Sequence, residues 1–357
     1  MTNAMPKWAW LLPALACLTL PVTIFYPAGP VFALAAIALI GAVFAAVHHA
    51  EVIAHKVGEP FGTLILAVAV TVIEVALIVS IMLSAGPDKS TLARDTVFAA
   101  IMIVCNGIVG LCLLLGGVRH HEQGFELQGA SAALGVLCAL SVLTLILPNY
   151  ATSTPGPTLS NSQLIFVGLI SLVLYLIFVF VQTVRHRDYF LSKDEASNDD
   201  HLPPPSLSAT MASAGLMLAS LVAVVGLAKT LSTVVEQTVA QAGAPKAVVG
   251  VVIAALVLLP EGLAALRAAR MNRLQNSLNL ALGSALASIG LTIPTVAAVS
   301  LILGQPIALG LDGKATVMLA LTLLQGVITL GTGRTTLLQG AIHLVIFATF
   351  LIFAVVP

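Results

Sequence analysis

The chain has 357 residues, of which 59% are hydrophobic and 8% are charged, and its formal net charge is zero. Soluble globular domains carry about 25% charged residues, so this composition excludes an ordinary soluble fold. The lack of net positive charge and of a basic arm also argues against nucleic acid as a partner.

The apolar residues occur in long unbroken blocks, which are typical of transmembrane helices and unlike the alternating pattern of β-barrel strands. We therefore predict an all-α polytopic membrane protein with about 11 transmembrane helices. The expected spans, in chain order, are residues 8–26, 30–48, 60–85, 94–117, 129–148, 163–183, 208–229, 245–266, 276–303, 314–331 and 336–356. A cleaved signal peptide is the alternative for the first span, but no small-residue cleavage site with a polar start follows it, which favours a retained helix.

Lysine and arginine are distributed unevenly among the connecting segments. If the N-terminus lies inside, ten of the fifteen basic residues fall in inner segments and five in outer segments. Inner loops of membrane proteins carry an excess of these residues, so the pattern predicts a cytoplasmic N-terminus. After an odd number of spans the C-terminus then lies on the far side of the membrane.

A polar, acidic stretch divides the chain at residues 185–206. We interpret it as a solvated cytoplasmic linker, because it lacks the spacing of an EF-hand calcium loop. Residues 1–29 hold an extra N-terminal helix, residues 30–184 a first five-helix repeat and residues 207–357 a second. Since five is odd, the two repeats enter the membrane with opposite polarity, which predicts inverted five-helix repeats.

Two of the spans carry a single acidic residue close to their middle, Glu74 in the third span and Glu261 in the eighth. A carboxylate at this depth costs at least about 2.5 kcal/mol, so such residues usually mark ion or proton pathways. The two acids have matching depths in spans that run in opposite directions, and we expect them to face each other. We predict a shared cation and proton site, and the alternative is a pair of protonated, hydrogen-bonded core acids.

Small polar residues accompany both glutamates. Thr71 lies one helical turn before Glu74, on the same face. The span that follows each glutamate carries a small, polar hexad, at residues 105–110 and 283–288. These hexads supply three further candidate ligands, Asn106, Ser284 and Ser288. Their oxygen atoms are hard ligands that suit calcium, sodium or potassium.

Pro260 directly precedes Glu261. Proline lacks a backbone N–H and clashes with the preceding helical turn. We therefore predict a helix break at Pro260, with freed carbonyl groups beside the carboxylate, as in the discontinuous helices of transporters.

Histidines gather at two places near the inner ends of spans. His55 belongs to a cluster with His48, His49 and Glu51 that we interpret as pH-sensitive, with a zinc site as the alternative. His120 and His121 form a second cluster, which we expect to sense cytoplasmic pH.

Two further ionisable residues have open roles. Glu59 begins the third span, where it either belongs to a proton access path or caps the helix. His343 is alone in the last span, and we expect it to be a hydrogen-bonded core histidine.

Several stretches resemble the calcium/cation antiporter superfamily, and within it the bacterial sodium–potassium/calcium:proton antiporters of the calcium/proton exchanger branch. They are Gly58 to Leu66 with Ile73-Glu74, Leu259 to Gly262, Leu282 to Ser284 with Thr292 to Pro294, Tyr175 to His186, and Gly333 to Gly340. The resemblance covers nearly the whole chain.

The resemblance implies that Glu74 and Glu261 bind the exported cation and exchange it for protons, with Thr71, Asn106 and Ser284 in supporting positions. It implies Ca²⁺ as the exported ion, with Na⁺ or K⁺ as further candidates and a monovalent-only antiporter as the alternative. It also implies a bacterial inner-membrane protein that needs no resident cofactor, has the lipid bilayer as its surroundings and is not an enzyme.

This sequence departs from the pattern of the calcium/proton exchangers at three positions. An asparagine usually stands three residues before each glutamate, where this chain has Thr71 and Leu258. A glutamine that is common in the second repeat is replaced by Ala287. Fewer oxygen ligands weaken the expectation of tight, calcium-only binding and leave sodium and potassium open.

Two other classes have less support. An intramembrane hydrolase would need a nucleophile with a nearby base, and Ser284 has neither the Gly-x-Ser-x-Gly context nor a histidine at comparable depth nearby. A channel would need a filter-like loop or a pore-lining repeat.

Overall fold

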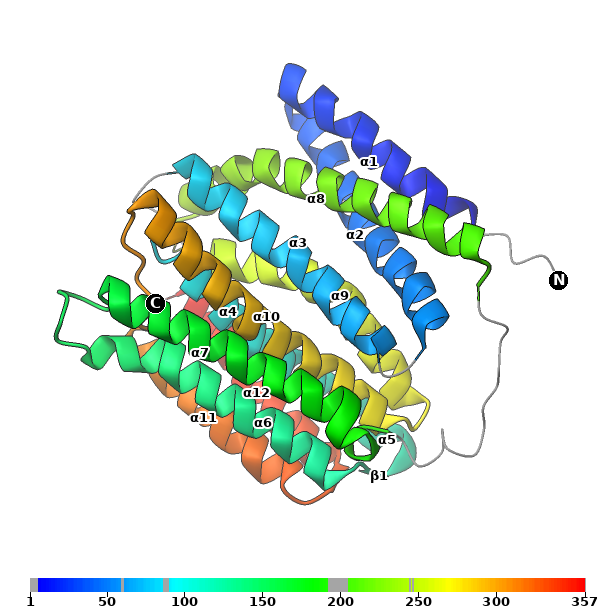
Figure 1. Ribbon diagram of the computed structural model, residues 1–357, viewed down its shortest axis with the longest axis vertical. Helices are drawn as coiled ribbons and strands as arrows, with labels where there is room; N and C mark the ends of the chain where they lie inside the picture. Colours follow the sequence, from blue (N-terminus) through cyan, green and yellow to red (C-terminus); the bar gives the residue numbers. More distant parts are fainter. Residues whose placement is uncertain are drawn as a thin grey trace. The chain divides into compact units, whose positions relative to one another are not determined.

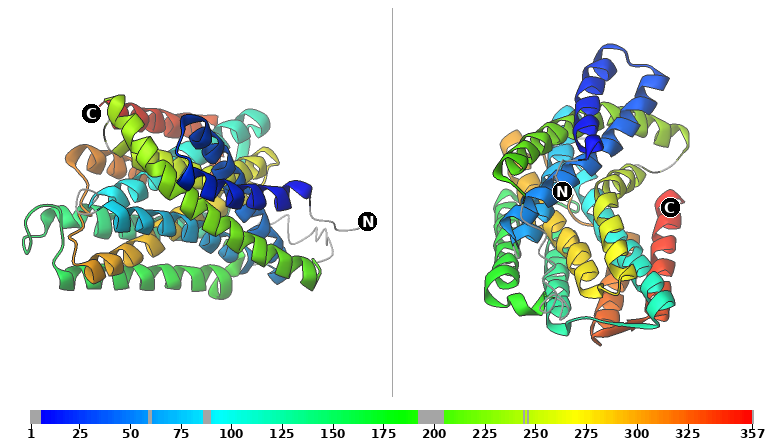
Figure 2. Two further views of the ribbon diagram at one scale, coloured as in Figure 1. Left: turned by 90° about the horizontal axis from the view of Figure 1, so that it is seen from above. Right: turned by 90° about the vertical axis from the view of Figure 1, so that its right-hand side faces the viewer.

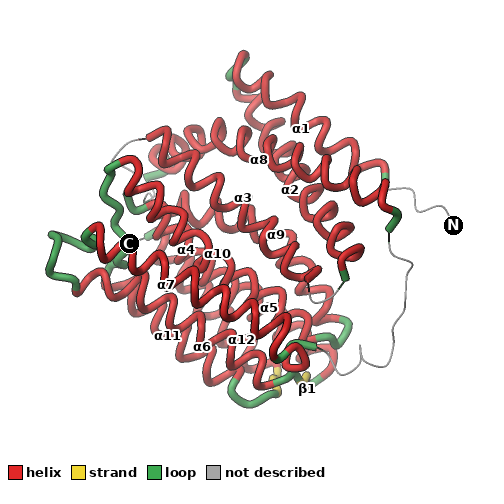
Figure 3. Tube along the Cα trace, in the orientation of Figure 1, coloured by secondary structure: helices red, strands yellow, loops and turns green. Residues whose placement is uncertain are grey.

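The computed structural model describes residues 6–58, 61–85, 90–191, 205–243, 245 and 247–356. The described chain is almost entirely helical, with one short pair of strands (Figure 1; Figure 3). It divides into two compact units. The first comprises residues 1–81 and 200–243, and the second comprises residues 82–199 and 244–357.

The first unit contains four helices. They are α1 (Lys7–Phe25), α2 (Gly29–Val57), α3 (Phe61–Ala85, as far as Ile81) and α8 (Leu207–Gln241). Helices α1, α2 and α8 pack against one another, and α1 and α2 run side by side (Figure 2). Both α2 and α8 extend well beyond the predicted spans. They continue because no glycine or proline interrupts their last turns until Gly58 and Gly243, which have positive φ angles of 82° and 69°.

The second unit contains the other spans. The first is a composite of α4 (Leu92–Met102), a π-helical turn η2 (Ile103–Ile108) and α5 (Val109–His120). The next two are also composites. One joins α6 (Leu127–Ser141) to η3 (Val142–Ile146) and η4 (Leu147–Tyr150), and the other joins α7 (Asn161–Phe180) to η5 (Val181–Arg185). A separate short 3₁₀ turn, η6 (Arg187–Tyr189), follows the second of them. The last four are α9 (Ala247–Arg270), α10 (Leu274–Leu303), α11 (Gly313–Leu330) and α12 (Leu337–Val355).

Helix starts in the second unit follow from local capping. Ser160 precedes α7 and Thr336 precedes α12, and each forms a capping box with a glutamine three residues later. Asp312 precedes α11, and its side chain accepts a hydrogen bond from the backbone nitrogen of Ala315 at 2.7 Å. These side chains satisfy backbone N–H groups that a helix start otherwise leaves unpaired.

Two short strands join distant loops of the second unit. β1 (Glu122–Gly124) follows α5, and β2 (Arg334–Thr336) precedes α12. They are antiparallel, with Gln123 opposite Thr335. An exposed ion pair of 3.1 Å between Arg334 and Glu122 adds little to the stability of this strand pair, because solvent screens it.

The predicted fold class is confirmed. Ten of the described helices are long and apolar enough to cross a membrane, and α3 adds a shorter apolar stretch at Val68–Ser80. Each of the eleven predicted spans therefore coincides with a helix or a composite of helices. The boundaries of the two repeats stay a prediction. The compact units do not coincide with them, because α8 belongs to the same unit as α1, α2 and most of α3.

Candidate cation site

In the first unit, Glu74 and Thr71 both lie on α3. Each side chain is buried, with 2% of its surface exposed. The two residues are three positions apart on one helix, so they lie on the same face, as predicted. A carboxylate buried within an apolar helix is the feature expected of an ion or proton site.

In the second unit, Glu261 lies on α9 and Ser284 on α10, two helices that pack against each other. Glu261 is 4% exposed, and Ser284 donates its hydroxyl to Glu261 Oε1 at 3.5 Å, which is at the long end of hydrogen bonding. Ser288 lies one turn after Ser284 and is also buried. The structure therefore brings together a buried acid and a predicted hydroxyl ligand that are 23 residues apart in the sequence.

The predicted break at Pro260 is wrong. Helix α9 runs from Ala247 to Arg270 with Pro260 inside it. A proline removes only one hydrogen bond from a helix, and membrane helices tolerate this loss when neighbouring helices support them. Helix α9 packs on α4, α5 and α10, and this packing keeps the helix continuous.

Asn106 lies in the π-helical turn η2 and is completely buried. Its Nδ2 donates to the hydroxyl of Thr322 on α11 at 2.8 Å and lies 3.9 Å from the sulfur of Met102. Its Oδ1 lies 3.0 Å from Nδ1 of His343 on α12. Sequence reasoning singled out Asn106 but missed these partners, because nothing in their spacing links α11 and α12 to η2.

Glu74 and Glu261 belong to different compact units, so their facing each other stays a prediction. Glu59 lies outside the described residues.

The histidines predicted to lie on the inner side have different environments. His49 is completely buried in the first unit, where Nε2 lies 2.9 Å from the carbonyl oxygen of Ala9 and Nδ1 lies 3.3 Å from the hydroxyl of Ser213. His55 is exposed at the end of α2. Within the described ranges no group of three His, Cys, Asp or Glu side chains is arranged to hold a metal, so the zinc alternative gains no support.

The second histidine cluster lies at the end of α5. His120 Nε2 lies 3.1 Å from the carbonyl oxygen of Arg270, at the end of α9. His121 is exposed and has a positive φ of 65°. This contact links the ends of two membrane helices, and a role of either histidine in pH sensing stays a prediction.

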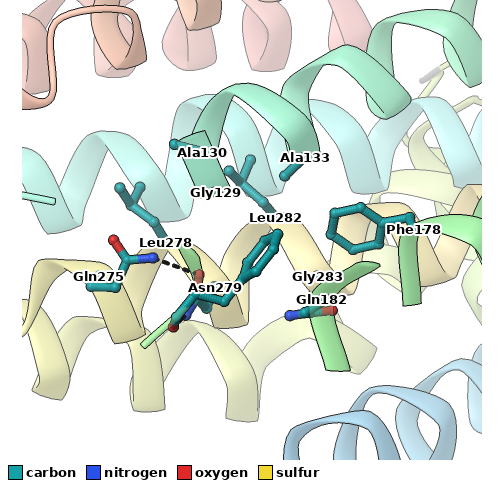
Figure 4. A pocket seen from close by; sticks show the side chains of 11 residues that line it. Gly129, Ala130, Ala133, Phe178, Gln182, Gln275, Leu278, Asn279, Leu282 and Gly283 are labelled. Carbon is teal, nitrogen blue, oxygen red and sulfur yellow. Dashed lines mark hydrogen bonds between the residues drawn. The ribbon is translucent and has the colours of Figure 1, made fainter. Parts of the chain in front are cut away.

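A small cavity between α6, α7 and α10 is lined mainly by small and apolar residues, together with the amide side chains of Gln182, Gln275 and Asn279 (Figure 4). Its volume is about 10 Å³, which suffices for roughly one water molecule. Gln275 donates to Asn279 at 3.0 Å, and Asn279 donates to the carbonyl oxygen of Phe190. Because these amides hold the segment that follows α7, we assign the cavity a structural role.

Ser284→Ala tests the pairing with Glu261. Removing the hydroxyl deletes one candidate oxygen ligand next to the carboxylate. We expect the half-saturating cation concentration to rise about fivefold, with a smaller change in the maximum rate. Initial rates of cation uptake into proteoliposomes measure both quantities. Ser284→Thr, which keeps the hydroxyl, should restore most of the affinity. An unchanged half-saturating concentration in Ser284→Ala would remove Ser284 from the site.

Sequence comparison gives a family match over most of the chain. A model described as sodium/calcium exchanger protein matches residues 28–184 and 212–356. A Sinorhizobium fredii protein named "putative ionic transporter y4hA" is 52% identical over 360 residues, covering 99% of this chain and 97% of that protein. The sodium-potassium/proton antiporter ChaA of Escherichia coli is 37% identical over 336 residues, covering 93% of this chain and 89% of that protein.

Comparison with solved structures gives the same fold. The crystal structure of the H⁺/Ca²⁺ exchanger CAX aligns with a TM-score of 0.73 over 98% of this chain and 89% of that chain. The sequence identity between the two is 15%, so this likeness shows the fold alone.

Proposed function

The chain belongs to the sodium/calcium exchanger protein family, and from this premise we propose that it is a secondary active antiporter that exports cations in exchange for protons. The observation that carries the proposal is the buried carboxylate of Glu261 on a membrane helix, with the hydroxyl of Ser284 directed at it. We assign Glu74 of α3 as the second carboxylate of the site.

The proposed mechanism follows from what a buried carboxylate can bind. Its negative charge can be neutralised by a proton or by a cation, but the same oxygen atoms cannot serve both at once. Mutually exclusive occupancy is the condition for antiport. The site must change the side of the membrane to which it is open only when it holds either a proton or a cation. Alternating exposure of the two glutamates to the two sides of the membrane would then couple proton influx to cation efflux.

We propose Ca²⁺ as an exported ion, because carboxylate and hydroxyl oxygens are the ligands that calcium prefers. A monovalent-only Na⁺ or K⁺ antiporter is the second candidate. The Escherichia coli relative is named a sodium-potassium/proton antiporter, and this name favours the second candidate. Leu258 and Ala287 are buried and supply no oxygen ligand, which also favours weaker coordination.

The protein is a multi-pass membrane protein. We propose that it lies in the bacterial inner membrane, with a cytoplasmic N-terminus and a periplasmic C-terminus, and that it needs no resident cofactor. The orientation rests on the excess of lysine and arginine in the segments assigned to the inside.

The experiment that tests this function measures Ca²⁺, Na⁺ and K⁺ fluxes in proteoliposomes as a function of pH. We expect a cation gradient to drive proton movement in the opposite direction. Because protons compete with the cation, the half-saturating cation concentration should fall with rising pH, by about tenfold per pH unit for each proton displaced. Cation current without proton movement would contradict antiport and support a channel. Proton-coupled transport of Na⁺ or K⁺, together with no transport of Ca²⁺, would establish the monovalent alternative.

A further inference from the structure

The π-helical turn η2 interrupts the span Leu92–His120 close to its middle. Such single-turn widenings are rare and occur often at functional sites. The turn packs on both α9 and α10, the helices that carry Glu261 and Ser284. A Cβ atom at Gly262, next to Glu261, would lie 3.1 Å from Cδ1 of Ile108, the last residue of the turn. The turn that holds Asn106 is therefore in contact with the helix of the predicted site.

Helix α12 approaches this turn closely, because glycines line the contact. A Cβ atom at Gly107 would lie 3.2 Å from the ring of Phe347, and a Cβ atom at Gly110 would lie 3.0 Å from Cβ of His343. Small residues at such contacts let membrane helices pack backbone to backbone. The close approach places the imidazole of His343, which is 1% exposed, beside the carboxamide of Asn106.

The donor and acceptor of each hydrogen bond around Asn106 can be assigned, beginning with a backbone carbonyl that can only accept. The carbonyl of Met318 can only accept, so the hydroxyl of Thr322 donates to it, at 2.8 Å. Thr322 has no second proton, and its oxygen must therefore accept from Asn106, also at 2.8 Å. The atom of Asn106 that faces Thr322 is thus the amide nitrogen, and the amide oxygen faces α12.

This orientation determines the tautomer that a neutral His343 adopts. Its Nδ1 faces the oxygen of Asn106 at 3.0 Å, so Nδ1 carries the proton and donates. In the neutral imidazole Nε2 accepts, and the hydroxyl of Thr329 donates to it at 2.9 Å. Thr329 in turn accepts from Gln325 Nε2 at 2.9 Å.

The result is a chain of polar groups from α11 and α12 that fixes the carboxamide of Asn106 in one orientation. An amide oxygen has two lone pairs, and His343 occupies one of them, so the oxygen keeps the capacity for one further ligand. We propose that His343 is a positioning residue for cation binding, which acts by holding the carboxamide of Asn106 from α12. This inference rests on the proposed function and deepens it.

The test combines His343 and Asn106 variants of the full-length protein in proteoliposomes, with Ca²⁺ and Na⁺ as the probes. In His343→Leu we expect the half-saturating cation concentration to rise about tenfold or more, with a smaller change in the maximum rate, as when a metal ligand loses its supporting partner. In His343→Asn an N–H remains near the position of Nδ1, and most of the affinity should return. Thr349→Val, at a half-buried position of the same helix outside the Asn106 hydrogen bonds, is the matched control and should match the wild type.

A double-mutant cycle separates positioning from general destabilisation. If His343 acts through Asn106, then His343→Leu should add nothing to the effect of Asn106→Ala. Additive effects, an unaltered affinity in His343→Leu or in Asn106→Ala, or a His343→Asn variant as impaired as His343→Leu would each overturn the proposal. If His343→Leu does not fold, Thr322→Val removes the acceptor on the other side of Asn106 and should give the same affinity loss, which Thr322→Ser should reverse.

The two proposals fail in different ways. If the wild-type protein shows no cation-coupled proton movement, or Glu261→Gln retains it, the proposed function fails. If the wild type exchanges and Glu261→Gln does not, but His343→Leu binds cations with wild-type affinity, only the role of His343 fails.

Discussion

Glu261→Gln is expected to abolish cation-dependent proton movement. Glutamine has nearly the same size as glutamate, so the packing of α9 against α10 should survive. It can neither release a proton nor supply negative charge to a cation, and both halves of the exchange cycle are lost together. The measurement is the dissipation of a pH gradient in inverted membrane vesicles after addition of Ca²⁺, Na⁺ or K⁺, and we expect the signal to fall to that of vesicles without the protein.

Glu74→Gln should have the same effect, since the proposed site needs both carboxylates. Glu236→Gln is the matched control, because Glu236 is also an acid within a membrane helix, α8, and belongs to neither predicted ligand set. This variant should exchange at the wild-type rate. If Glu74→Gln exchanged normally while Glu261→Gln did not, the site would have one essential carboxylate in place of two, and the repeat-related pairing would be refuted.

Gly340→Ala is expected to destabilise the second unit strongly. A Cβ atom at Gly340 would overlap the backbone nitrogen of Leu114 on α5 and lie 2.7 Å from the Cα atom of that residue. Backbone atoms cannot move aside as a flexible side chain can, so α12 must separate from α5. We expect a loss of about 3 kcal/mol in stability, at the upper end of overpacking effects. In a thermal unfolding assay in detergent the midpoint should fall by about 5 °C or more.

Gly135→Ala is the control for this substitution. Gly135 also lies within a membrane helix, α6, but a Cβ atom there would meet no atom within 4 Å. Alanine is a better helix former than glycine by up to about 1 kcal/mol, so this variant should be at least as stable as the wild type. Equal melting of Gly340→Ala and the wild type would show that α5 and α12 do not pack backbone to backbone.

The sequence alone was sufficient for the spans and for the positions of the two acids within them. A membrane helix is defined by the length and hydrophobicity of one continuous segment, and these are local properties. The position of Glu74 or Glu261 within such a segment follows by counting. The error at Pro260 has the opposite origin, because whether a proline interrupts a helix depends on the neighbours that support it.

Only the tertiary structure decided which polar groups meet. The hydrogen bond between Asn106 and His343 joins residues 237 positions apart, and the bond between Asn106 and Thr322 joins residues 216 apart. No sequence pattern marks these partners, because they depend on the π-helical turn and on how closely glycines let α12 approach α5. Hydrophobicity therefore placed each helix in the membrane, whereas the packing of one helix surface on another determined which side chains share a hydrogen bond.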